Sequence, residues 1–200
     1  GTGAQATSAL TSYGIAIGAA ANAEGGVAMG TNAKATTPSS VAIGSGSVAE
    51  NGVSIGENAK STSCAVAVGI GADASDGAHA IAFGFPSKGS GSNSTAIGID
   101  AESSGNLSQA IGYSATASGS QSIAFGQDTD AKSTHSTAIG LGANIGTGAD
   151  ASTAIGRTAK VGDDAYNSIA FGTAAEVTAK ESVAIGQGAK ASASQSNAIG

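Results

Sequence analysis

Four glycine-rich stretches are the first part of this sequence that could do chemistry. They read GSGSVA from Gly44, GIGADA from Gly69, GLGANI from Gly140 and GQGAKA from Gly186. A dinucleotide-binding loop has a similar spacing of glycines, but it also needs one preceding strand, a following helix and an acidic residue further along. Here the pattern recurs within one repeat family, which indicates a turn. The sequence therefore predicts no nucleotide and no other cofactor.

Two histidines and the single cysteine are the other residues with possible chemistry. His79, His135 and Cys64 all stand five residues before a recurring glycine, where other repeats carry Asn93 and Asn167. No cluster of acidic or thiol ligands accompanies them, which favours polar turn residues over a metal site. For Cys64 a free thiol is favoured over an inter-chain disulfide. The sequence contains no HExxH motif and no paired-carboxylate arrangement, so no catalytic residue is predicted and we do not expect an enzyme.

A register of glycines runs through the whole chain and organises it. With 32 glycines, 4% aromatic residues and no tryptophan, the composition disfavours a helical bundle, while only 11% charged residues disfavours disorder. The recurring glycines are spaced by 12 to 16 residues, most often 14, and we predict that they are structural turn residues. They are Gly18, Gly30, Gly44, Gly56, Gly69, Gly84, Gly98, Gly112, Gly126, Gly140, Gly156, Gly172 and Gly186, with Gly200 closing the series.

Large and small residues alternate around each glycine, which is the periodicity of a β-strand. The residue before the glycine is large and apolar, and the one before that is alanine everywhere except at Ser54. A second short strand follows the glycine, so each repeat contains two strands and a polar loop of variable length. Repeats this small must stack to bury anything. We predict an all-β parallel β-solenoid with coils of about 14 residues, forming one domain over residues 1–200.

The alternation also suggests which side chains fill the solenoid. We expect the large residue, such as Ile139, to point into its own coil and the neighbouring Ala138 to face a partner chain. An alanine wall permits close approach of another copy, so a homo-oligomer is expected. Phe83, Phe125 and Phe171 are expected to fill widened coils.

Charge is confined to other positions of the repeat and predicts an outer binding face. Neither the xAIG core nor the small positions after the glycine carries a charged residue. The net charge of −6 with scattered basic residues argues against nucleic acid, and no apolar run is long enough to span a membrane. The acidic members of the polar ladder are Asp73, Glu102, Asp130 and Glu176, and the lysines proposed as the outer binding face are Lys34, Lys60, Lys88, Lys160 and Lys190.

Hexapeptides along the chain carry a resemblance to a known family. NSTAIG at 93–98, NSIAFG at 167–172 and SVAIG at 40–44 and 182–186 are similar to the YadA-type head repeats of trimeric autotransporter adhesins. The resemblance covers essentially the whole chain. It implies a left-handed parallel β-roll, a homotrimer, and display on the outer membrane surface of Gram-negative bacteria as the head fragment of a longer, anchored protein.

The resemblance also implies a function in cell adhesion and virulence. Such a head would attach to host matrix proteins, for example collagen or fibronectin, or to host receptors, without nucleic acid and with the membrane reached only through an anchor outside this sequence. The alternative left open is a non-adhesive β-solenoid module that binds ice or carbohydrate.

Overall fold

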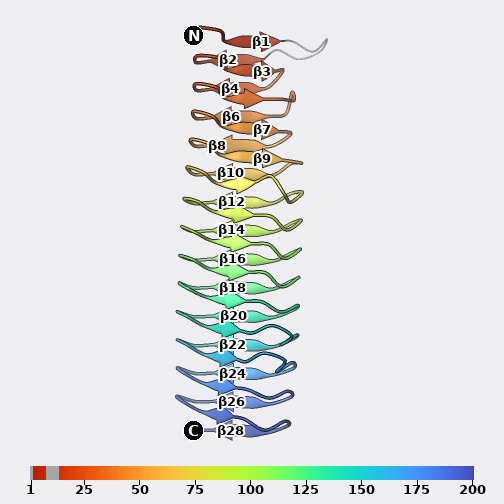
Figure 1. Cartoon of the computed structure of the whole chain (residues 1–200), viewed down its shortest axis with the longest axis vertical. Helices are drawn as coiled ribbons and strands as arrows, with labels where there is room; N and C mark the ends of the chain where they lie inside the picture. Colours follow the sequence, from red (N-terminus) through yellow and green to blue (C-terminus); the bar gives the residue numbers. More distant parts are fainter. Residues whose placement is uncertain (1, 8–13) are drawn as a thin grey trace. The chain divides into compact units, whose positions relative to one another are not determined.

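The computed structural model describes residues 2–7 and 14–200, and this part of the chain contains strands and turns but no helix. Its internal contacts divide it into two compact units, Gly1–Asp100 and Ala101–Gly200. Each unit contains two kinds of strand that alternate along the sequence (Figure 1). The prediction of one domain over residues 1–200 stays a prediction.

The strands are short, and their positions follow the glycine register. The even-numbered strands end directly before a register glycine, and the odd-numbered strands from β3 on begin a few residues after one. In the first unit the odd strands are β1 (Gln5–Thr7), β3 (Asn22–Glu24), β5 (Lys34–Ala35), β7 (Val48–Glu50), β9 (Lys60–Thr62), β11 (Asp73–Ala74) and β13 (Lys88–Gly89). Its even strands are β2 (Ile15–Ile17), β4 (Val27–Met29), β6 (Val41–Ile43), β8 (Val53–Ile55), β10 (Val66–Val68), β12 (Ile81–Phe83) and β14 (Thr95–Ile97).

The second unit repeats this arrangement. Its odd strands are β15 (Glu102–Ser103), β17 (Thr116–Ala117), β19 (Asp130–Ala131), β21 (Asn144–Ile145), β23 (Lys160–Val161), β25 (Glu176–Val177) and β27 (Lys190–Ala191). Its even strands are β16 (Gln109–Ile111), β18 (Ile123–Phe125), β20 (Thr137–Ile139), β22 (Thr153–Ile155), β24 (Ile169–Phe171), β26 (Val183–Ile185) and β28 (Asn197–Ile199).

Within each unit, every odd strand pairs in parallel with the next odd strand and every even strand with the next even strand, so the two kinds of strand form separate sheets. Equivalent residues are matched across successive coils, as in Ala124↔Ala138 and Ala138↔Ala154. This is the predicted all-β parallel β-solenoid, with about 13 turns of about 14 residues. Each coil therefore stacks its own copy of the repeat on the next.

The core of each unit consists of small side chains. The middle residue of every even strand from β4 to β26 is fully buried, and it is alanine except at Ser54. The second residue of each odd strand from β3 to β27 is buried as well and is mostly alanine or serine. Larger interior side chains occur in β21, β23 and β25, where Ile145, Val161 and Val177 are completely buried.

The expectation for Ile139 and Ala138 is therefore wrong. Ala138 is completely buried in its own coil, whereas Ile139 is half-buried on the outside of the even sheet. Phe125 likewise lies outside with 51% of its surface exposed, as do Phe83 and Phe171, so the rings do not fill widened coils. The physical reason is room: two short strands joined by tight turns leave space for methyl and hydroxymethyl groups, and an isoleucine on every coil would overpack it.

One corner of each coil is made by the register glycine. Gly140 has φ of 130°, and Gly142 two residues later has φ of 65°. A Cβ atom on Gly140 would lie 2.5 Å from the carbonyl oxygen of Gly156 in the next coil, whereas a Cβ on Gly142 would come no closer than 3.5 Å to Thr158. Gly140 is thus required both by its φ and by the close approach of two backbones.

The opposite corner is held from inside by a ladder of buried serines in the second unit. Backbone N–H groups of Ser168 and Ser182 donate to the hydroxyl oxygens of Ser152 and Ser168, at 3.0 and 3.1 Å. The Ser168 hydroxyl in turn donates to the carbonyl oxygen of Ala179 at 3.1 Å, and that of Ser182 donates to Ala193 at 2.8 Å. These side chains satisfy backbone groups that the sheets leave unpaired at the corner.

Candidate binding surface

The two sheets present outer faces of opposite character. The outward residues of the even strands are mainly Val, Ile and Phe, with some Thr, and no even strand carries a charged residue. The outward residues of the odd strands are mostly polar, and the predicted lysines are among them. A single chain therefore has an apolar face suited to contact with another copy and a charged face suited to solvent or a ligand.

The first residues of the odd strands form a continuous ladder within each unit. In the first unit Lys60 pairs in register with Asp73, and Asp73 pairs with Lys88. Lys34 belongs to the same ladder and is separated from Lys60 by Val48. Because neighbouring parallel strands are about 4.8 Å apart, consecutive ladder side chains can reach one another.

The ladder of the second unit contains Glu102, Thr116, Asp130, Asn144, Lys160, Glu176 and Lys190. Lys160 pairs in register with Glu176, and Glu176 pairs with Lys190. The Lys190 ammonium lies 3.0 Å and the Lys160 ammonium 3.7 Å from the two oxygens of the Glu176 carboxylate. The hydrogen bond from Lys190 holds the pKa of Glu176 below its ordinary value. The charge of these two lysines is therefore partly neutralised within the protein.

A second ion pair of the same face lies between strand and loop. The Lys132 ammonium is 2.8 Å from an oxygen of the Asp130 carboxylate. The hydrogen bond to Asp130 and its negative charge raise the pKa of Lys132 above its ordinary value. The negative charge of Asp130 is therefore partly neutralised by Lys132, which lies on the same coil.

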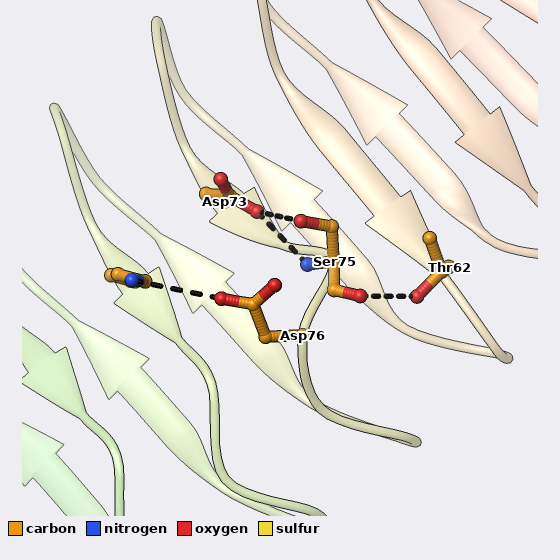
Figure 2. A network of polar contacts seen from close by, with 5 residues as sticks. Thr62, Asp73, Ser75 and Asp76 are labelled. Atoms are coloured by element: carbon orange, nitrogen blue, oxygen red, sulfur yellow. Dashed lines mark hydrogen bonds and ion pairs between the residues drawn. The ribbon is translucent and has the colours of Figure 1, made fainter.

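In the first unit the carboxylate of Asp73 takes part in a local network of hydrogen bonds (Figure 2). The backbone N–H and the hydroxyl of Ser75 both donate to one oxygen of its carboxylate, at 2.9 and 2.5 Å. The Thr62 hydroxyl donates to the carbonyl oxygen of Ser75 at 2.7 Å and ties this loop to the preceding coil. The Lys88 ammonium forms its ion pair with the Asp76 carboxylate, at 3.6 Å, and not with Asp73, its neighbour in the strand register.

Lys34 and Lys60 differ from the other three predicted lysines. All five side chains are exposed, but neither Lys34 nor Lys60 forms an ion pair with any residue in the described ranges 2–7 and 14–200. An unpaired surface ammonium is fully available to an anionic ligand group. The structure therefore separates the predicted lysines into a paired set and an unpaired set, a distinction that sequence spacing does not provide.

The histidines and the cysteine lie at the second corner of the coil. His79, His135 and Cys64 have φ of 56°, 57° and 63°, in the left-handed region that Asn adopts more readily than most residues. Asn93 and Asn167 occupy the same conformation in other coils, with φ of 55° and 53°. This conformation gives the physical reason for the preference for Asn at this position of the repeat.

Within the described residues, no group of three or more His, Cys, Asp and Glu side chains could hold a metal ion. Over the same ranges, none of the structure is a helix with the length and hydropathy needed to cross a bilayer.

The apolar outer face is what sequence reasoning missed. The signal was available, because charge is excluded from every even strand although only the middle residue of each strand is needed for the core. Large outward residues, such as Ile123 and Phe125 in β18, form a face that a lone chain would leave in water.

Comparison with known families gives one result. The family model described as YadA head domain repeat (2 copies) matches residues 21–47, 90–115, 103–129, 164–189 and 178–200. These segments together cover more than half of the chain. A comparison with curated proteins gives no match.

Proposed function

Because the chain belongs to the family of YadA head domains, we propose that it is the head of a homotrimeric adhesin that binds host ligands at a bacterial surface. The left-handed winding, the three-fold symmetry and the surface location come into the proposal from the family. The observation that carries the proposal is the division of each coil into an apolar face without charge and a polar face with a ladder of charges.

The apolar even face is the surface proposed to meet the other two chains. Phe83, Phe125 and Phe171 are each more than half exposed in a single chain, and Ile17 is 54% exposed. Each apolar side chain that becomes buried stabilises the assembly by up to about 1.5–3 kcal/mol. Because such residues recur in every coil, the contact extends along the whole repeat and closes an otherwise exposed hydrophobic face.

The charged odd face is the surface proposed to bind the host ligand. Each exposed charge contact contributes only about 0–1 kcal/mol, so useful affinity must come from many contacts along one chain and across three chains. The ligand proposed is a matrix protein such as collagen or fibronectin, or a host receptor. The structure favours Lys34 and Lys60 as the strongest contributors, since no internal ion pair neutralises them.

Two variants of equal charge test this assignment. Lys34→Ala/Lys60→Ala removes two unpaired ammonium groups, and Lys160→Ala/Lys190→Ala removes two that share Glu176. Binding to immobilised collagen and fibronectin is measured by surface plasmon resonance at low and high salt, with light scattering after size exclusion to check the trimer. We expect the first variant to bind more weakly than the second, and the variant with all five lysines replaced to lose most binding while remaining trimeric.

A failure of either half of the proposal is visible separately. A well-folded monomer at micromolar concentration contradicts the trimer. Unchanged binding after all five lysines are replaced contradicts recognition by the charged face. An ice-binding role is less well supported, because the odd face mixes Lys, Asp, Glu and Asn with threonine, and thermal hysteresis of the purified chain would test it directly.

A further inference from the structure

A turn position of the first unit carries three consecutive large apolar residues on the outside. Ile70, Phe85 and Ile99 each follow a register glycine directly, and they are 53%, 56% and 49% exposed. We name these three residues the rim stripe. In the preceding coils of the same unit the equivalent residues are Ala19, Thr31, Ser45 and Glu57, all exposed.

The rim stripe is continuous because its coils are adjacent and in register. Val68 pairs with Phe83 and Phe83 pairs with Ile97, and each of them stands two residues before a member of the stripe. Glycines separate these pairs from the stripe, and a Cβ on Gly69 or Gly84 would collide with the carbonyl oxygen of the next glycine. The turns are therefore stacked closely, with steps of about 4.8 Å from coil to coil.

Contact between copies of the chain does not account for the rim stripe. The last residue of every even strand in this unit is apolar, including Ile17, Met29, Ile43 and Ile55 in coils whose turn residue is small or polar. A subunit contact that followed the repeat and reached the turn position would bury Glu57 together with Ile70. Burying an unpaired carboxylate is costly, so the turn position lies outside such a contact.

Charge at the two ends of the stripe indicates the chemistry of an occupant. Glu57 holds the turn position in the coil before Ile70, and Asp100 follows Ile99; both are exposed. Across the first and second turn positions of this unit these are the only charged residues, and both are acidic. An apolar stripe with one carboxylate in the coil before its first member and another beside its last member complements an extended segment with apolar side chains flanked by basic ones.

We propose that Ile70, Phe85 and Ile99 form a docking site for an extended polypeptide whose apolar side chains are flanked by Lys or Arg. The site deepens the proposed function, on which it rests, because it adds a discrete apolar contact to the distributed charges of the odd face. Glu57 and Asp100 orient the segment through its basic residues, and the stripe receives the apolar ones.

The repeat itself supplies the substitutions that test the site. Ile70→Thr/Phe85→Ser/Ile99→Thr gives these coils turn residues that the fold accepts at Thr31 and Ser45. The probe is the synthetic peptide Lys-Lys-Phe-Thr-Phe-Thr-Phe-Lys-Lys carrying a fluorescent label, measured by fluorescence anisotropy with the full 200-residue chain. One comparison peptide has Ser in place of each Phe, and another has Glu in place of each Lys. Leu141→Ser, a change at the same turn position in another coil, is the matched control.

We expect saturable binding of the Phe and Lys peptide, weakened about tenfold or more by the triple substitution and little by Leu141→Ser. Glu57→Gln/Asp100→Asn should weaken binding and reduce its dependence on salt. Both comparison peptides should bind poorly. Equal binding of the peptide to the triple variant, or no binding to the parent protein, overturns the proposal.

Light scattering on the same samples separates this inference from the proposed assembly. A triple variant that loses the oligomer of the parent places the rim stripe in the subunit contact and overturns the docking site. A parent protein that is monomeric but binds the peptide through the stripe contradicts the assembly and supports the site.

Discussion

Gly140 and Gly142 lie in the same turn, but a side chain would meet different obstacles at the two positions. For Gly142→Ala the cost is that of a left-handed conformation, about 1–2 kcal/mol, because the added methyl has room. For Gly140→Ala the φ of 130° is joined by a clash with the Gly156 carbonyl, so we expect about 3 kcal/mol or more. Urea unfolding of the two variants makes the comparison, and equal stabilities would contradict the close backbone contact.

Ile139 and Ile145 test which side chains form the core. Ile145 is completely buried inside its coil, so Ile145→Ala should lower the free energy of unfolding by about 2–5 kcal/mol. Ile139 lies on the outer face of β20, so Ile139→Ala should weaken the oligomer without opening a cavity inside the coil. Circular dichroism melting and light scattering separate the effects. A greater loss of stability in the Ile139 variant, with the oligomer of the parent retained, would support the arrangement first expected from the sequence.

At the scale of elements, the serine ladder links one corner of each coil to the next. Ser168→Ala removes the acceptor for the buried N–H of Ser182 and should cost about 1–3 kcal/mol. Ser122 is the matched control, because its buried hydroxyl oxygen has no hydrogen-bond partner among the described residues. Ser122→Ala should therefore be neutral or slightly stabilising. Thermal melting compares the two, and equal losses would mean that the hydroxyl contacts do not matter.

The outer ion pairs of β23, β25 and β27 give the protein a small acid sensitivity. Because the pKa of Glu176 is lowered in the folded state, its contribution is present at neutral pH and is lost as pH falls through that lowered value. The pairs are exposed, so the effect is below about 1 kcal/mol and should shrink at high salt. Glu176→Gln should flatten the melting temperature between neutral and acidic pH relative to the parent. An unchanged pH profile would show that the pairs do not persist in solution.

The sequence predicts the strands well but not which face is inside. A period of two residues divides Thr137, Ala138 and Ile139 into two faces of the strand. The period does not indicate which of the two faces points to the core. The usual preference for large apolar residues inside gives the wrong answer for Ile139, since the interior of most coils has room only for small side chains such as alanine and serine. The ion pairs of Lys160 and Lys190 with Glu176 were out of reach, because the glycine register places the three residues in one ladder but does not give their side-chain conformations.

At the scale of the whole molecule, folding and assembly are expected to be coupled. Each chain has a core made mostly of small side chains and leaves most of its large ones outside, so a homotrimer would supply much of the hydrophobic burial. The melting temperature should then rise with protein concentration, since each tenfold increase favours assembly by about 1.4 kcal/mol for each of the two association steps. Calorimetry over a hundredfold concentration range tests this, and a constant melting temperature would indicate that each chain is stable alone.

The loops at the corner opposite the glycines vary in length, so this corner can accept inserted residues. The coils that end at Gly156 and Gly172 have 16 residues instead of 14, and yet Ile139 still pairs with Ile155 and Asn144 with Lys160. Extra residues are extruded between β21 and β22 without disturbing either sheet. Thr147 and Gly148 are exposed at the tip of this loop, so the bond between them is a permissive insertion point, where a foreign epitope could be grafted and shown on the surface while the repeat beneath it keeps its stacking.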